Sequence, residues 1–246
     1  MLYSIMPKVL IHTASLFDWF QPYTDHLDDR IHAALDAGFD GVEVSNGVPL
    51  LDWQPQARTV ERMRDGGHTL TIHAELGEHF PGANLPRLER LVARLPLPVA
   101  NVVFHPDELT AREMDELQTL PFPVTIENMD QTRACWRTAD ELRPLLRGPV
   151  GLTFDTAHAE EHGLSAADFD GLPIHTVHLS ISDRQGLYSG RATGHALTYH
   201  RPERFPAVPS APLVVVEGVV PASAHILRRE LDYVRQHLSR LIPASA

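Results

Sequence analysis

The segment Val124-Thr-Ile-Glu127 ends a short apolar run with a side chain that binds metals, and the same design recurs along the chain. The other segments of this form are Leu70-Thr-Ile-His73, Val102-Val-Phe-His105, Leu152-Thr-Phe-Asp155, Thr176-Val-His178 and Val214-Val-Val-Glu217. Short continuous runs of Val, Ile and Leu are typical of strands buried on both faces in a parallel sheet. The repeated pattern therefore predicts a parallel β/α barrel whose strand ends meet at a metal.

Helical patterns fill the gaps between these runs. We expect strands at 8–12, 41–45, 69–73, 100–105, 123–127, 150–155, 174–179 and 213–217, with helices between them, including 24–37 and 223–239. Gly38 ends the predicted helix at 24–37. Three later helices begin with capping-box patterns, at Thr110/Glu113, Thr138/Glu141 and Ser165/Asp168. Right-handed crossovers in such an alternating chain predict a closed (β/α)8 TIM barrel. An open doubly wound sheet is the competitor, and the first strand lacks the Gly-x-Gly-x-x-Gly that favours it.

The length of the sequence suits one TIM-barrel domain over residues 1–246, because a single barrel needs about 250 residues. The single cysteine, Cys135, excludes an internal disulfide and fits a reducing compartment. No apolar run approaches the length of a membrane span, and the start lacks the form of a signal peptide, so we expect a cytoplasmic protein. The net charge of −11 and the absence of a basic block disfavour a nucleic-acid partner.

The strongest functional signal is the convergence of Glu127, Asp155, His178 and Glu217 at successive strand ends. In a barrel these ends form the active face. Three unpaired carboxylates in one mouth would repel each other, and a divalent cation removes that cost. Mixed oxygen and nitrogen ligands suit Mn²⁺, Co²⁺, Mg²⁺ or Zn²⁺. The sequence therefore predicts a divalent-metal site, and nothing in it calls for an organic cofactor.

Several motifs resemble the xylose isomerase-like TIM barrel superfamily, which includes sugar phosphate isomerases and epimerases as well as endonuclease IV. The matching segments are Gly41-Val-Glu-Val, Thr71-Ile-His, Val103-Phe-His-Pro, Ile126-Glu-Asn, Thr153-Phe-Asp-Thr-Ala-His158, Val177-His-Leu-Ser-Ile-Ser-Asp-Arg184 and Val215-Val-Glu217, and they span almost the whole chain. The resemblance implies a metal held by the same four residues.

The epimerase branch of this superfamily implies further roles. By that resemblance Glu127 and Glu217 serve as ligands and as the catalytic acid and base on opposite faces of a bound ketose. His158 and Arg184 match positions that hold substrate oxygens. The alternatives are that His158 is a surface histidine at a helix start and that Arg184 is a loop arginine paired with Asp183.

The endonuclease IV branch gives a different reading of His73 and His105. There, matching histidines hold a second zinc, so these two residues either bind a second metal with Glu127 or line a substrate pocket. The Asp-x-His pair of that family's third zinc site falls at Tyr188 and Gly190, which disfavours a three-metal phosphodiesterase. His195, nearby, either contacts the substrate or is an exposed loop residue, and we expect the second.

Three hypotheses follow. The first is a metal-dependent isomerase or epimerase of carbohydrate metabolism that acts on a small ketose, cyclitol or hydroxy-carbonyl compound, by proton abstraction next to the carbonyl. A dehydratase of the same superfamily would share that chemistry. The second is an endonuclease IV-like zinc phosphodiester hydrolase, and the third is a non-catalytic barrel. Residues Phe17, Trp19 and Phe20 either cover the substrate or pack against a helix. The sequence does not decide whether the protein is a monomer or a homo-oligomer.

Overall fold

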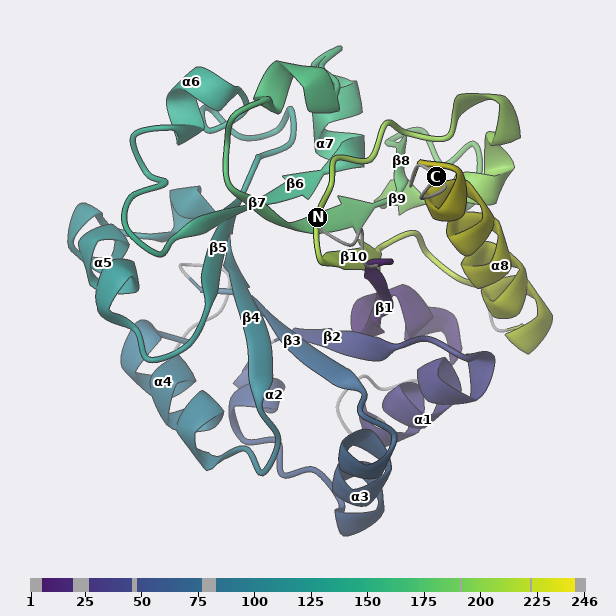
Figure 1. The fold of residues 1–246 in the computed structure, drawn as a ribbon, viewed down its shortest axis with the longest axis horizontal. Helices are drawn as coiled ribbons and strands as arrows, with labels where there is room; N and C mark the ends of the chain where they lie inside the picture. The colour runs from purple at the N-terminus through teal and green to yellow at the C-terminus, as the bar shows by residue number, and fades with distance from the viewer. Residues whose placement is uncertain are drawn as a thin grey trace, which may run out of the picture.

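The expected barrel is present. The computed structural model describes residues 6–19, 27–45, 48–76, 83–190, 192–221 and 223–241. Parallel strands close on themselves in the order β1-β10-β7-β6-β5-β4-β3-β2 (Figure 1). Their bounds are β1 (Lys8–His12), β2 (Gly41–Ser45), β3 (Thr69–Ala74), β4 (Val99–Phe104), β5 (Val124–Glu127), β6 (Gly151–Asp155), β7 (Ile174–Leu179) and β10 (Leu213–Val216). Each lies within one residue of the predicted range at either end, and the TIM-barrel prediction is confirmed.

Helices surround the barrel (Figure 1). The α-helices are α1 (Leu27–Ala37), α2 (Val48–Leu51), α3 (Ala57–Asp65), α4 (Leu85–Arg94), α5 (Ala111–Glu116), α6 (Ala139–Leu142), α7 (Thr156–Glu161) and α8 (Ala224–Leu241). Short 3₁₀ turns are η1 (Thr13–Trp19), η2 (Pro106–Glu108), η3 (Leu117–Thr119), η4 (Ala166–Phe169), η5 (Thr198–His200) and η6 (Pro202–Arg204). Among the described helices, none is both long and apolar enough to cross a membrane.

The predicted helix signals are present in the structure. All three capping boxes form, at α5, α6 and η4. Gly38 follows α1 with φ of +99°, a left-handed conformation that suits glycine at a helix end. Phe20 and positions 24–26 lie outside the described residues, as do the side chains of Phe17 and Trp19.

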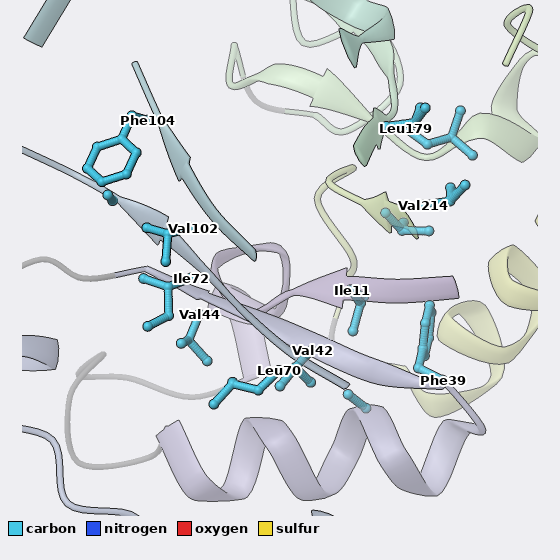
Figure 2. Close-up of a cluster of buried hydrophobic side chains, with 14 of the residues drawn as sticks. Ile11, Phe39, Val42, Val44, Leu70, Ile72, Val102, Phe104, Leu179 and Val214 are labelled. Atoms are coloured by element: carbon cyan, nitrogen blue, oxygen red, sulfur yellow. The ribbon is translucent and has the colours of Figure 1, made fainter. Parts of the chain in front are cut away.

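The hydrophobic core lies between the strands and the helices. Val42, Val44 and Leu70 are almost fully buried, and Figure 2 shows them pointing from their strands toward a neighbouring helix. Each such side chain contributes roughly 1.5–3 kcal/mol of stability when fully buried. Because side chains alternate along a strand, the residues between them face the barrel interior.

The interior below the mouth is unusually polar. Asn101 donates through Nδ2 to Thr125 at 2.7 Å and, across the barrel, to Thr176 at 3.1 Å. Thr125 also bonds Thr153 at 2.6 Å. Buried polar groups that find partners in this way rigidify their surroundings. The network therefore forms a fixed polar floor beneath the strand ends.

An antiparallel hairpin extends the chain beyond β7 at the mouth. It pairs β8 (Ile181–Asp183) with β9 (Gly194–Ala196). Glycine is required at position 218, two residues after the end of β10, because a Cβ there would lie 2.6 Å from backbone atoms of Ala196 and Leu197. The close approach fixes the hairpin against the last barrel strand.

Candidate metal centre and active site

A cavity of ≈ 280 Å³ opens among the carboxyl ends of the strands. Its lining is rich in imidazoles and carboxylates: His12, Ala14, Ser15, His73, Glu75, His105, Glu127, Met129, Asp130, Arg133, His158, Thr193, His195, Glu217 and Val219. The site therefore lies on the face that the strand-end pattern predicts.

The four residues predicted to hold a metal come together. Ligand atoms of Glu127, Asp155, His178 and Glu217 all lie within 4.8 Å of one another. Nδ1 of His178 lies 2.9 Å from Oε1 of Glu127 and 3.4 Å from Oε1 of Glu217. We call these four residues the primary cluster. They come from β5, β6, β7 and the residue after β10, so four separate strands position one site.

The electrostatics of the primary cluster favour a bound cation. Burial, with the nearby charges of Glu127 and Asp155, raises the pKa of the Glu217 carboxyl well above its usual range, although His178 opposes the shift. Burial alone would also raise the pKa of Glu127, but His178, His105 and His73 outweigh it and lower the pKa well below its usual range. Without a cation, protonation of groups such as Glu217 therefore reduces the repulsion between the negative charges of the cluster.

Two further observations fit a metal. Oδ2 of Asp155 is buried and has no hydrogen-bond partner among the described residues, whereas Oδ1 accepts from the backbone N–H of His158 at 2.7 Å. Nε2 of His178 lies 3.0 Å from Oε1 of Glu43, which leaves Nδ1 facing the primary cluster. A carboxylate behind a histidine is a frequent arrangement around metal ligands, because it fixes the tautomer and the ring orientation.

Glu43 should therefore tune metal affinity without being a ligand. His178 and the other neighbouring histidines outweigh the effect of burial and lower the pKa of the Glu43 carboxyl to about 2, so the group is charged at neutral pH. Glu43→Gln is expected to weaken Mn²⁺ binding about 10- to 100-fold, the usual cost of losing such a partner. Calorimetric titration of chelator-stripped protein measures the change. The Glu116→Gln variant, which changes a partly exposed residue paired with Arg112 on the surface, is the control. An unchanged Kd in Glu43→Gln would contradict this role.

A second cluster adjoins the first. Nε2 of His73 and Nε2 of His105 each lie 3.2 Å from Oε2 of Glu127, whose other oxygen faces His178. Nδ1 of His105 lies 3.2 Å from Glu108. The two oxygens of Glu127 thus face two different sets of imidazoles, which is the geometry of a carboxylate that could bridge two metals.

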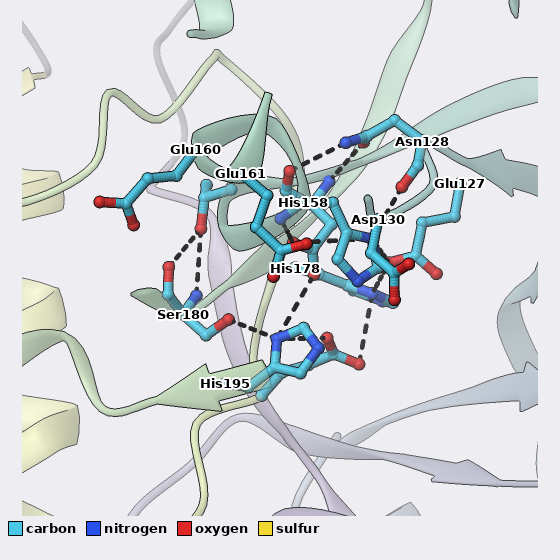
Figure 3. Close-up of polar contacts among 12 residues, drawn as sticks. Glu127, Asn128, Asp130, His158, Glu160, Glu161, His178, Ser180 and His195 are labelled. Carbon is cyan, nitrogen blue, oxygen red and sulfur yellow. Dashed lines mark hydrogen bonds and ion pairs between the residues drawn. The ribbon is translucent and has the colours of Figure 1, made fainter. Parts of the chain in front are cut away.

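The two residues expected to touch substrate differ in position. His158 is buried, lines the cavity, and donates through Nδ1 to the backbone oxygen of Asn128 at 2.8 Å (Figure 3). The alternative of a surface histidine is therefore wrong. Arg184 pairs with Asp130 and, at 2.8 Å, with Glu161 rather than with Asp183. It is absent from the described cavity lining, and a substrate contact from Arg184 stays a prediction.

Other cavity residues were missed or misjudged from the sequence. The expectation of an exposed His195 is wrong: the hairpin places its imidazole in the cavity wall, where the side chain is 22% exposed. Arg133 and Glu75 also line the cavity without having been singled out. Burial, with the charge of His73, lowers the pKa of His12 to about 3, so this cavity imidazole is neutral.

The chain resembles known proteins in its fold but not in its sequence. The sequence matches no family model and no curated protein. Among solved structures, L-ribulose 3-epimerase matches with a TM-score of 0.63 and 14% identity, over 97% of this chain and 99% of that one. The chain has the fold of the ketose 3-epimerases.

Two further epimerase structures match the fold of this chain over nearly its full length. D-allulose 3-epimerase from Methylomonas sp. matches with a TM-score of 0.61 and 15% identity, over 96% of this chain and 99% of that chain. The 3-keto-D-glucoside 4-epimerase from E. coli matches with a TM-score of 0.59 and 16% identity, over 94% and 99% of the two chains. The resemblance to xylose isomerase-like barrels is therefore confirmed at the level of the fold.

Proposed function

We propose that this chain is a divalent-metal-dependent epimerase or isomerase of a small ketose, cyclitol or related hydroxy-carbonyl compound. The observation that carries the proposal is the primary cluster, in which an oxygen of Glu127 and an oxygen of Glu217 both lie within 3.4 Å of Nδ1 of His178. The epimerase fold supports it, since relatives in fold include enzymes of this reaction class.

The residues of the primary cluster have distinct tasks in this proposal. When bound, a divalent cation would polarise the substrate carbonyl and acidify the adjacent carbon-bound proton. Asp155 and His178, with Glu127 and Glu217, would hold that cation. Glu127 removes the proton from one face of the substrate, and Glu217 returns a proton to the other, which inverts the carbon. Return of the proton to the neighbouring carbon gives aldose–ketose isomerisation. Departure of the hydroxyl group on the next carbon as water, with a proton from the acid residue, gives dehydration.

The test is deuterium incorporation. Protein loaded in turn with Mn²⁺, Co²⁺, Mg²⁺ or Zn²⁺ is incubated in D₂O with a panel of free ketoses and cyclitols, and the products are identified by NMR and chromatography. We expect one ketose to gain deuterium at the carbon next to its carbonyl as an epimer or isomer appears. Failure to exchange any ketose or cyclitol with Mn²⁺, Co²⁺, Mg²⁺ or Zn²⁺ bound would contradict the proposal.

A phosphodiester hydrolase of the endonuclease IV type is the second candidate. The observation in its favour is the second cluster, because His73 and His105 contact the oxygen of Glu127 that faces away from His178. We propose that this cluster can take a second divalent cation. Cleavage of abasic duplex DNA at low salt by the zinc-loaded protein would support hydrolysis, and absence of both binding and cleavage would exclude it.

A further inference from the structure

We propose that His195 is a substrate-binding residue that, together with His158, holds one hydroxyl group of the substrate. The inference rests on the proposed function and deepens it, because it assigns part of the cavity wall to hydroxyl recognition. It concerns the side of the primary cluster nearest Asp155 and Glu217.

The backbone that carries His195 is fixed in place. Residues of β9 pair with β8 in register, with Ser182 opposite His195. The backbone N–H of Val219 donates to the oxygen of His195 at 3.5 Å, and Gly218 permits the close approach. Ala196, next to His195, is fully buried. A side chain on such an anchored strand is held in one place before substrate arrives, which is what a binding residue requires.

The imidazole of His195 lies just outside the primary cluster. Its Nδ1 is 3.9 Å from Oε2 of Glu217 and 4.0 Å from Oδ2 of Asp155, too far for a hydrogen bond to either. The same nitrogen lies 2.8 Å from the hydroxyl of Ser180. The ring of His158 packs against that of His195, with centroids 5.2 Å apart. The pair therefore forms a wall beside the metal site (Figure 3).

The hydrogen-bonding capacity of His158 and His195 determines which substrate group the pair can bind. A carbonyl oxygen only accepts, so Nδ1 of His158 carries the proton that it donates to Asn128, and its Nε2 is an acceptor when the ring is neutral. When the Ser180 hydroxyl donates to Nδ1 of His195, Nε2 of His195 becomes a donor. An acceptor on one ring and a donor on the neighbouring ring match a hydroxyl group, which both donates and accepts.

A metal ligand role for the same pair is disfavoured. Asp155 has one oxygen free, since Oδ1 caps the backbone of His158, and that free oxygen belongs to the primary cluster. Nδ1 of His195, the nitrogen nearer the carboxylates, is already bonded to Ser180. The geometry therefore points to the substrate as the partner of His195.

The experiment compares His195→Phe and His195→Gln with wild type, using the exchanging ketose and its deoxy analogues that each lack one hydroxyl. We expect His195→Phe to lose about 10- to 100-fold in kcat/KM, the cost of an unmade buried hydrogen bond. Wild type should lose a similar factor for one deoxy analogue, and the Phe variant should not distinguish that analogue from the parent ketose. His195→Gln should lose less, and metal content should not change.

The control is His200→Phe, which alters a histidine that lies outside the cavity lining and stacks on Tyr199. Three results would overturn the inference while the proposed function stands. They are an equal loss of kcat/KM in both Phe variants, an unchanged kcat/KM in His195→Phe, and the loss of a metal equivalent from His195→Phe. No exchange by wild type on any ketose would instead overturn the proposed function, and the inference with it.

Discussion

Glu127→Gln is expected to lower kcat/KM for deuterium exchange into the substrate by at least about 10³-fold. A positioned acid or base contributes about 10²- to 10⁴-fold to a proton transfer, and Glu127 is in addition a predicted metal ligand. Gln has nearly the same shape, so the buried position can still be filled. Exchange is measured by NMR in D₂O, and retention of fold is checked by circular dichroism.

The control for Glu127→Gln is the Glu116→Gln variant. Glu116 lies on the surface of α5, where it pairs with the exposed Arg112. We expect its activity to match wild type. If Glu127→Gln instead exchanged protons within about threefold of wild type while Glu217→Gln did not, the assignment of Glu127 as an acid/base group would be wrong.

Removal of metal is expected to cost both activity and stability. The primary cluster is assembled only in the folded chain, so a cation that binds it stabilises the native state selectively. At 100 times its Kd, such a ligand contributes about 2.7 kcal/mol. For a chain of this size that corresponds to a rise of about 5–10 °C in Tm.

Calorimetry of chelator-treated protein, with and without added Mn²⁺, measures this shift. Asp155→Asn is the matched variant, because Asn can still cap α7 through its side-chain oxygen while the charged ligand is lost. We expect its melting temperature to respond little to Mn²⁺. An equal shift in wild type and variant would mean that the metal stabilises the protein from some other place.

The barrel could be predicted because its signals are local and repeated. Each strand is a short apolar run, and each predicted capping box depends on residues three apart. The positions of Glu127 and Asp155 at strand ends then fix where they lie, since parallel strands in a barrel share one open end. Convergence of the primary cluster therefore follows from topology alone.

The remaining features depend on contacts between distant segments. β9 is only three residues long, and its pairing with β8 leaves no periodic pattern in the sequence, so His195 was expected to be exposed. The partners of Arg184 are similarly remote: Glu161 lies on α7, and Asp130 follows β5. Loop residues such as these are positioned by tertiary packing, which single-sequence patterns do not encode.

We predict that Glu127, Asp155, His178 and Glu217 together hold a divalent cation. Elemental mass spectrometry of protein purified without chelator or an affinity-tag metal tests it most directly, with wild type and Asp155→Asn compared. We expect at least one equivalent of Mn, Co, Mg or Zn per wild-type chain, a second equivalent if His73 and His105 also bind, and a loss of about one equivalent in the variant. A metal-free wild type that also fails to bind added cations, or equal metal in both proteins, would contradict it.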